Sequence, residues 1–194
     1  MICIPITARK INDALEQIKE ASKDADVIEL RLDYLKELSE KDLKRLLKSS
    51  RKPFICTCRK IEEGGLFKGT ETKRIAVLKK AMKLKTEYID LEYGTSKTNK
   101  EKIHEYNKKH KTKIILSKHY FGHTPEYEDL IKLFNKMNKE KHYVLKIITK
   151  ANTHEDGKLI FSLLKYAKRK GVKLISFCMG RMGRDSRILS MPLG

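Results

Sequence analysis

Strand-like and helix-like segments alternate along the whole chain, and this alternation restricts the possible folds more than any other feature. Seven short apolar runs of strand length cover residues 2–7, 27–33, 53–59, 88–93, 113–121, 143–149 and 173–179. Helix-like segments lie near residues 10–22, 39–49, 71–84, 97–109, 126–138 and 153–169. Such alternation predicts a parallel sheet covered by helices. No linker or low-complexity segment interrupts the pattern, so we expect residues 1–194 to form a single domain.

Residues typical of helix ends mark several of these boundaries. Ser39 with Asp42, and Thr153 with Asp156, have the spacing of an N-cap residue followed by an acid at the third helical position. Gly171 is suited to end the helix before the seventh strand, because glycine adopts the left-handed conformation common at helix ends. These signals support the boundaries drawn from the apolar runs.

Two folds are compatible with such a sheet, a doubly wound sheet and a (β/α) barrel. A doubly wound nucleotide-binding fold usually has a glycine-rich turn after its first strand, but here that turn reads TARK. A barrel predicts functional side chains at the carboxyl ends of several strands. Charged or titratable residues occupy these positions: Glu29, Arg31, Arg59, Asp90, Glu92, His119, Lys146 and the segment GRMGRDSR after the seventh strand. We therefore predict a TIM-type (β/α) barrel, in which Asp90 and Glu92 could equally serve as stabilising partners of nearby cations.

The chain is strongly basic, with 44 lysines and arginines against 25 acids and a net charge of +19. Such an excess admits nucleic-acid binding. However, the basic residues are spread over the expected helices and the loops after them, and aromatic residues are not interleaved with them as a single-strand platform requires. We therefore favour a solvated lysine coat over a nucleic-acid module, and its positive field can still attract a small anionic substrate.

Apolar runs and cysteine positions indicate the cellular environment. The runs are too short for a membrane-spanning helix, and the N-terminus MICIPITARK resembles a first strand rather than a signal peptide. We expect a cytoplasmic protein. The cysteines, Cys3, Cys56, Cys58 and Cys178, all lie in strand-like runs. We expect buried free thiols there rather than disulfides or a metal site.

Lys146 is the most informative of the strand-end residues, because it lies inside the apolar run YVLKIIT. Burial and nearby cations, such as Arg59 or Arg187, disfavour the charged form of a lysine. A lysine that is neutral part of the time can attack a carbonyl carbon and form a Schiff base. The alternative is a structural ion pair, for example with Glu92.

Two further residues are suited to move a proton near Lys146. His119 ends the fifth strand-like run, and histidine is the usual proton carrier near neutral pH. Its alternative role is that of a hydrogen-bonded core histidine. Glu63 directly precedes Gly64 and Gly65 in the loop after the third strand, where it either lies in a surface turn or orients His119 as a carboxylate orients a base.

The segment MGRMGRDSRI after the seventh strand combines two glycines with three arginines. Glycines allow a close approach of the backbone, and an arginine can bind a carboxylate with two hydrogen bonds. A phosphate site is the alternative, because barrels often bind phosphate after strands seven and eight.

Six short motifs occur in an order that resembles one family. They are ELR (residues 29–31), TCR with EEGG (57–65), DLE (90–92), SKHYF (117–121), KII (146–148) and MGRMGRDSRI (179–188). Together they resemble the type I 3-dehydroquinate dehydratases of the shikimate pathway, especially the short archaeal ones. Each motif is weak alone, but six in the right order on the right strands are specific, and they extend over nearly all of the chain.

The resemblance implies a cofactor-free lyase that dehydrates 3-dehydroquinate to 3-dehydroshikimate, with the fold of a (β/α)8 barrel. It assigns the Schiff base to Lys146, general acid and base catalysis to His119, and the support of that histidine to Glu63. It implies substrate binding by the remaining motif residues, which are Glu29, Arg31, Arg59, Met179 and Arg187. It assigns no metal site. It also implies a homodimer, and the absence of a membrane or nucleic-acid partner.

The sequence departs from the family pattern at two places. Many relatives have a second methionine where this chain has Phe177. The family also has an eighth strand and a mobile lid loop after the segment that ends here at Gly194, so we expect the chain to lack both. Alternatives to the dehydratase are another Schiff-base barrel enzyme, such as an aldolase, an inactive scaffold, and a basic nucleic-acid-binding module.

Overall fold

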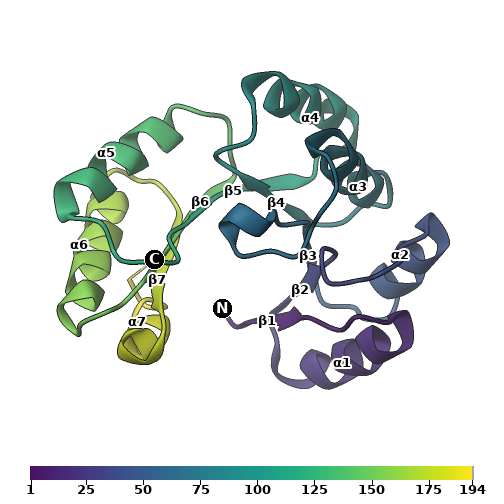
Figure 1. Cartoon of the computed structure of the whole chain (residues 1–194), viewed down its shortest axis with the longest axis horizontal. Helices are drawn as coiled ribbons and strands as arrows, with labels where there is room; N and C mark the ends of the chain where they lie inside the picture. The colour runs from purple at the N-terminus through teal and green to yellow at the C-terminus, as the bar shows by residue number, and fades with distance from the viewer. Residues whose placement is uncertain (194) are drawn as a thin grey trace. The chain divides into compact units, whose positions relative to one another are not determined.

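The computed structural model describes residues 1–193 as strands and helices in strict alternation (Figure 1). The strands are β1 (Cys3–Ile6), β2 (Val27–Arg31), β3 (Phe54–Thr57), β4 (Tyr88–Glu92), β5 (Lys113–His119), β6 (Val144–Lys150) and β7 (Leu174–Met179). The helices are α1 (Ile11–Asp24), α2 (Glu40–Leu47), α3 (Glu71–Lys83), α4 (Lys97–His110), α5 (Tyr127–Asn138), α6 (Glu155–Arg169) and α7 (Arg184–Leu189). Two short 3-10 turns, η1 (Ile61–Glu63) and η2 (Arg181–Gly183), follow β3 and β7. All seven expected strands and six expected helices are therefore present, and α7 is an addition.

The strands are parallel and their order in the sheet is the order of the sequence. This topology follows from the helix that separates each strand from the next, because a parallel neighbour requires a crossover connection. In such an arrangement the carboxyl ends of neighbouring strands lie at the same edge of the sheet. Residues that follow or end neighbouring strands are consequently expected to lie near one another.

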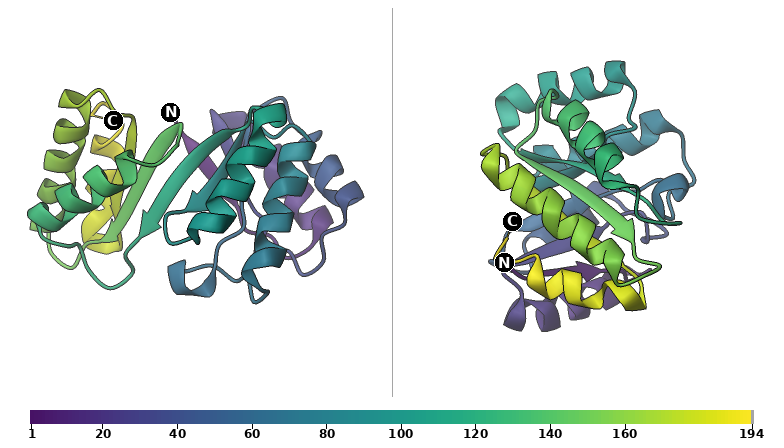
Figure 2. Two further views of the ribbon diagram at one scale, coloured as in Figure 1. Left: turned by 90° about the horizontal axis from the view of Figure 1, so that it is seen from above. Right: turned by 90° about the vertical axis from the view of Figure 1, so that its left-hand side faces the viewer.

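The described chain divides into two compact units, each with its own core. Unit 1 consists of Met1–Leu91 and Thr95–Lys113, and unit 2 consists of Glu92–Gly94 and the chain from Ile114 onward. In unit 2 the helices α5 and α6 lie along one face of the strands (Figure 2). Apolar side chains from both helices and from β5–β7, among them Phe134, Leu145 and Leu164, form one buried cluster.

Helix boundaries follow the capping chemistry with one correction. Ser39 and Asp42 form a complete capping box at α2, in which Ser39 Oγ accepts from Asp42 N at 3.0 Å. Gly171 has φ +68° and follows the last residues of α6, as predicted. Thr153 is not an N-cap, because α6 begins at Glu155; Asp156 instead accepts from Thr153 N at 2.8 Å and holds the preceding loop.

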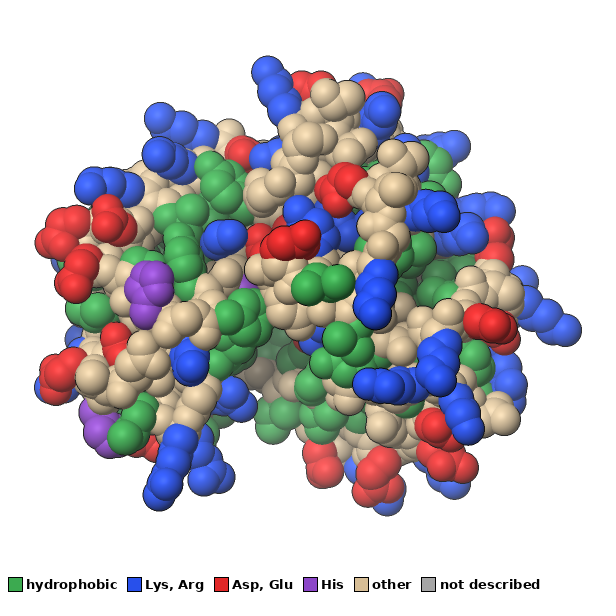
Figure 3. Space-filling view, viewed as in Figure 1, with side chains coloured by type: hydrophobic (Ala, Val, Ile, Leu, Met, Phe, Trp, Pro, Cys, Tyr) green, Lys and Arg blue, Asp and Glu red, His purple; other side chains and the backbone are tan. Residues whose placement is uncertain are grey.

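Basic side chains are scattered over the face shown in Figure 3 rather than gathered in one stripe. Several basic residues of the described chain pair with an acid on the same helix, as Lys108 does with Glu105 at 2.6 Å. None of the helices in the described part of the chain has both the length and the apolar composition that a bilayer span requires.

Cys3 corrects the expectation that all four cysteines are buried. Cys56, Cys58 and Cys178 are buried, whereas Cys3 is exposed. β1 is the first strand in the sheet order and pairs with β2, and three of its four residues are at least partly exposed. The position of Cys3 in an apolar run predicted a strand correctly, but not how completely that strand is covered.

Thiol labelling tests this difference. Burial raises the pKa of Cys56 to about 12, so this thiol lacks both solvent access and thiolate character at pH 8. We expect a thiol-specific disulfide reagent to label one cysteine of the native protein rapidly and the others only after unfolding. Cys3→Ser should remove the rapid phase. Rapid labelling of two or more thiols in the native protein would contradict the assigned burial.

Candidate functional site

In unit 1 the carboxyl end of β2 carries Glu29 and Arg31, and each has a defined partner. Thr57 Oγ1, on the neighbouring strand β3, donates to Glu29 Oε1 at 2.6 Å. Arg31 donates through Nε and Nη2 to the two oxygens of Asp33 at 3.0 and 2.8 Å. Burial opposes the charge of Arg31, but the hydrogen bonds and charge of Asp33 raise its pKa above the usual value. Both residues are half-buried and fixed in position.

Asp33 also ties β2 to the loop after β3. Its Oδ2 accepts from Leu66 N at 3.0 Å, and its side chain is fully buried. The sequence analysis missed Asp33. It lies in the turn that follows β2, so the alternation of side chains along a strand gives no sequence signal for its pairing with Arg31.

Arg59 and Glu63 form the second group in unit 1, and both are buried. Arg59 Nη2 donates to Asp90 Oδ2 at 2.8 Å, and its Nη1 lies 4.0 Å from Glu63 Oε2. A buried guanidinium is tolerated when carboxylates compensate its charge. The structure therefore confirms the stabilising role considered for Asp90, and it brings Glu63 to Arg59.

The turn after β3 explains why Glu63 points inward. Residues Ile61–Glu63 form η1, and Gly64 ends it with φ +72°. A Cβ atom on Gly65 would lie 2.0 Å from Arg59 O, so only glycine permits this close approach. The two glycines thus fold the loop back onto Arg59, and the surface-turn alternative for Glu63 is wrong.

Arg74 is a second residue that the sequence analysis missed. It lies on α3, is fully buried, and donates to Cys58 O at 3.2 Å and to Thr95 Oγ1 at 2.7 Å. It also binds both oxygens of Glu71, at 2.9 and 2.8 Å. Because Cys58 follows β3 and Thr95 follows β4, Arg74 connects the two strand ends beside Arg59. A lone arginine in a helix gives no sequence signal of such a role.

In unit 2 the register of β5 and β6 brings Lys146 and His119 to one face. Ser117 lies opposite Lys146, and His119 lies opposite Ile148. Because side chains alternate along a strand, Ser117 and His119 share the face of Lys146. Leu145 and Ile147 point to the other face and belong to the apolar cluster under the helices. The lysine and the histidine are therefore diagonal neighbours on adjacent strands.

Lys146 and His119 are both half-buried rather than fully enclosed. The apolar run around Lys146 predicted a buried strand, and its neighbours are indeed buried. The lysine faces away from the apolar cluster, as does Ile148, but it is only partly covered there. The His119 ring stacks on Phe121, with centroids 6.2 Å apart and planes 20° apart.

Strand β7 continues this face toward the arginine segment. Ile175 lies opposite Lys146, Phe177 opposite Ile148, and Met179 opposite Lys150. Phe177 and Met179 therefore share the face of Lys146 and are half-buried there.

Arg187 reaches this region from α7, which the sequence analysis did not predict. Ser186 Oγ accepts from Cys178 N at 2.8 Å and donates to Gly183 O at 2.6 Å, so the helix is fastened to β7. The Arg187 guanidinium lies over the Phe177 ring, with its Cζ 5.6 Å from the centroid. The phosphate alternative for this segment gains no support from these contacts, and the carboxylate role stays a prediction.

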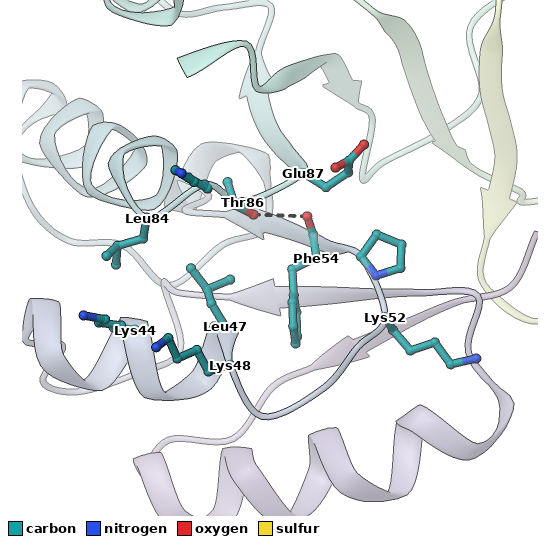
Figure 4. A pocket seen from close by; sticks show the side chains of 10 residues that line it. Lys44, Leu47, Lys48, Lys52, Phe54, Leu84, Thr86 and Glu87 are labelled. Carbon is teal, nitrogen blue, oxygen red and sulfur yellow. Dashed lines mark hydrogen bonds between the residues drawn. The ribbon is translucent and has the colours of Figure 1, made fainter. Parts of the chain in front are cut away.

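A separate hollow of about 260 Å³ lies at the other end of the strands in unit 1 (Figure 4). Lys44, Lys48, Lys52 and Lys85 surround it, over a floor that includes Phe54. It lies where helices α2 and α3 end. Lysines there complement the negative end of each helix dipole, so we assign them to helix stability rather than to a substrate site.

The site residues predicted from the sequence thus fall into two groups. Unit 1 contains Glu29, Arg31, Arg59 and Glu63, and unit 2 contains His119, Lys146, Met179 and Arg187. The partnership of Glu63 with His119 joins the two units and stays a prediction. Among residues 1–193, no group of three or more His, Cys, Asp and Glu side chains is arranged to hold a metal ion.

Comparison with known proteins identifies the family. The model of the type I 3-dehydroquinase family matches residues 2–194. The chain belongs to this family. It is 36% identical over 193 residues to a 3-dehydroquinate dehydratase from Desulfotalea psychrophila, with coverage of 100% of this chain and 84% of that protein. It is 33% identical over 195 residues to the one from Methanocaldococcus jannaschii, with coverage of 100% and 85%.

Solved structures of dehydratases support the fold assignment. The type I enzyme from Clostridium difficile superimposes with a TM-score of 0.91 at 23% identity, over 100% of this chain and 80% of that one. The 3-dehydroquinate dehydratase from Enterococcus faecalis gives a TM-score of 0.89 at 25% identity, over 100% and 85%. The TIM-type α/β fold class of the dehydroquinases and the family resemblance are therefore confirmed.

The Arg74–Glu71 pair makes a prediction about stability and pH. Hydrogen bonds from Arg74 lower the pKa of Glu71. The pair therefore stabilises the fold above the unfolded pKa of about 4.3, and this contribution is lost as the pH falls through the lower, folded value. We expect Glu71→Gln to reduce the free energy of unfolding by about 1 kcal/mol at pH 7, a value discounted for the partial exposure of Glu71. The difference from the unmodified protein should shrink below pH 4.

Urea unfolding at several pH values measures this difference. Glu105→Gln is the matched control, because Glu105 forms a similar pair with Lys108 whose side chains are 71% and 69% exposed. The control should change stability by less than about 0.5 kcal/mol at any pH. An equal effect of both substitutions would contradict the structural role of Arg74.

Proposed function

We propose that this chain dehydrates 3-dehydroquinate to 3-dehydroshikimate through a Schiff base on Lys146. Membership of the type I 3-dehydroquinase family, and relatives named as 3-dehydroquinate dehydratases, support the reaction. The observation that carries the mechanism is the β5–β6 register, which puts an amine and an imidazole on one face of adjacent strands. These are the two groups that imine chemistry with proton transfer requires.

The first step is attack of the neutral Lys146 amine on the C3 ketone of the substrate. Nitrogen forms a bond to carbon, the carbonyl oxygen leaves as water, and a protonated imine results. The imine withdraws electrons from the adjacent carbon, so the C2 proton becomes acidic. Lys146 is half-buried rather than fully enclosed, and this partial exposure suits a lysine that reacts with a ligand.

His119 then acts as the base and the acid. It removes the C2 proton and returns a proton to the C1 hydroxyl, which leaves as water while the carbon–carbon double bond forms. Hydrolysis of the imine by a second water releases the product and the free amine, so the net change is the loss of one water molecule. We infer that Glu63 supports the imidazole during these transfers, as the family resemblance implies. No step calls on a cofactor.

The remaining predicted residues hold the substrate. Arg187 is the proposed partner of the substrate carboxylate, because a guanidinium can bind a carboxylate with two parallel hydrogen bonds. Glu29, Arg31 and Arg59 are proposed to bind the ring hydroxyls, and Met179 to line the pocket. The net charge of +19 favours the approach of an anionic substrate.

We also propose, from the family resemblance, that the chain forms a homodimer and is located in the cytoplasm. Analytical ultracentrifugation of the purified chain tests the first, since a dimer doubles the 22.6 kDa mass. A monomer at micromolar concentration would leave the chemistry of the site unaffected.

Trapping of the imine tests the role of Lys146. Borohydride reduces an imine to a stable secondary amine, so treatment in the presence of dehydroquinate should attach the substrate covalently to Lys146, as peptide mass spectrometry detects. Lys146→Ala should abolish the adduct. Lys150→Ala is the matched control, because Lys150 lies on the same strand and face but is exposed, and it should retain the adduct. An adduct on any other lysine would refute the assignment.

Removal of the imidazole separates the two stages of the reaction. His119→Asn retains a polar side chain without a group that titrates near neutral pH, so imine formation should persist while elimination slows by about 10²–10⁴-fold. Borohydride trapping measures the first stage, and ultraviolet absorbance of the conjugated enone measures the second. Loss of both stages to the same degree would assign His119 to substrate binding instead.

A further inference from the structure

Arg187 is held in a different way from the other arginines of the predicted site. Arg31 and Arg59 donate to carboxylates, at 2.8 Å in each case. Arg187 is exposed, and within residues 1–193 no acid forms an ion pair with it. Its guanidinium instead lies over the ring of Phe177.

An aromatic ring holds a guanidinium without consuming its donors. The attraction is to the face of the ring, so the five N–H groups in the guanidinium plane stay available. A carboxylate partner would occupy two of them and cancel the charge. A ring is therefore a suitable support for an arginine that must bind an incoming anion with its edge.

The backbone of Arg187 is fixed independently of the ring. The neighbouring Ser186 is 2% exposed and is hydrogen-bonded to Cys178 N and Gly183 O. These bonds set the position of α7 on β7, but the long arginine side chain keeps its own rotational freedom. The Phe177 ring is the described contact that restricts the guanidinium itself.

Phe177 also lies on the same face as Lys146, on the neighbouring strand. Lys146 is opposite Ile175, and Phe177 is two residues further along β7 on the same face. With about 4.8 Å between strands and about 3.3 Å per residue, its Cα lies about 8 Å from that of Lys146. The ring that Arg187 rests on therefore lies on the face from which Lys146 would bind a ketone.

We propose that Phe177 positions the guanidinium of Arg187 to receive the carboxylate of the substrate, an inference that rests on the function proposed above. Phe177 is a positioning residue here, because it acts through Arg187 rather than on the reacting atoms. An exposed cation–π contact is weak, so its loss should impair substrate binding modestly and leave the imine chemistry intact.

Steady-state kinetics of matched variants provide the first test. Phe177→Leu should raise KM for dehydroquinate about two- to fivefold, with kcat changed by less than about twofold. Phe177→Tyr keeps the ring face and should retain the original KM. Phe161→Leu is the control for aromatic truncation, because Phe161 is also partly buried against the core of unit 2 but lies on α6. It should lower thermal stability without a change in KM.

A double-mutant cycle distinguishes positioning from direct substrate contact. In the background of Arg187→Met, which itself should raise KM strongly, Phe177→Leu should have almost no further effect. The same two- to fivefold effect in both backgrounds would overturn the proposal and make Phe177 a wall of the pocket or a purely structural residue.

Nuclear magnetic resonance tests the contact without the reaction. Ring current from Phe177 should shift the side-chain protons of Arg187, and this shift should persist in Phe177→Tyr and vanish in Phe177→Leu. An unchanged Arg187 signal in Phe177→Leu would overturn the proposal even if the chain is an active dehydratase. Conversely, a folded chain without dehydratase activity would contradict the proposed function. The ring-current shift would then still report whether Phe177 contacts Arg187.

Discussion

Pairing between β5 and β6 is the constraint on which the chemistry of unit 2 depends. Side chains alternate with a period of two, so a shift of one residue would turn Lys146 into the apolar cluster and Leu145 toward the substrate face. The observed register, with Ser117 opposite Lys146, keeps the buried residues of both strands under the helices. Burial of the apolar side chains of β5 and β6 therefore fixes which face the Lys146 amine occupies. The same register both forms the core and brings the proposed catalytic pair together.

A second constraint is the free-energy cost of burying a charged group. It determines which partners the arginines near the strand ends have. Arg59 and Arg74 are buried, and each faces at least one carboxylate, to which Arg74 adds a carbonyl and a hydroxyl oxygen. Arg187 is exposed and needs no counter-charge, so an aromatic ring suffices to orient it. The buried arginines consequently hold strand ends and loops in place, and the exposed one is left with the donors that an anion would use.

Much of this arrangement could be predicted from the sequence, because the fold rests on local patterns. Apolar runs located the seven strands of the described chain. Arg31 and His119 do end their strands, as selected, whereas Lys146 is the third of the seven residues of β6. The exposure of Cys3 and the presence of α7 could not be predicted in this way. Both depend on what covers or anchors a segment, such as the bond from Cys178 N to Ser186, and this is long-range information. Arg74 was missed for the same reason, because its partners Cys58 and Thr95 are distant in sequence.

The large positive charge also has a structural component that composition alone does not reveal. Each helix from α1 to α6 has at least one basic residue in its last turn, and all of them except α4 have an acid in the first turn. This distribution complements the helix dipole, whose negative end is the carboxyl end. Because the helices return the chain to the start of the next strand, their basic ends lie near the amino end of that strand, as Lys44, Lys48 and Lys85 do around the hollow in unit 1. Part of the lysine excess therefore stabilises individual helices.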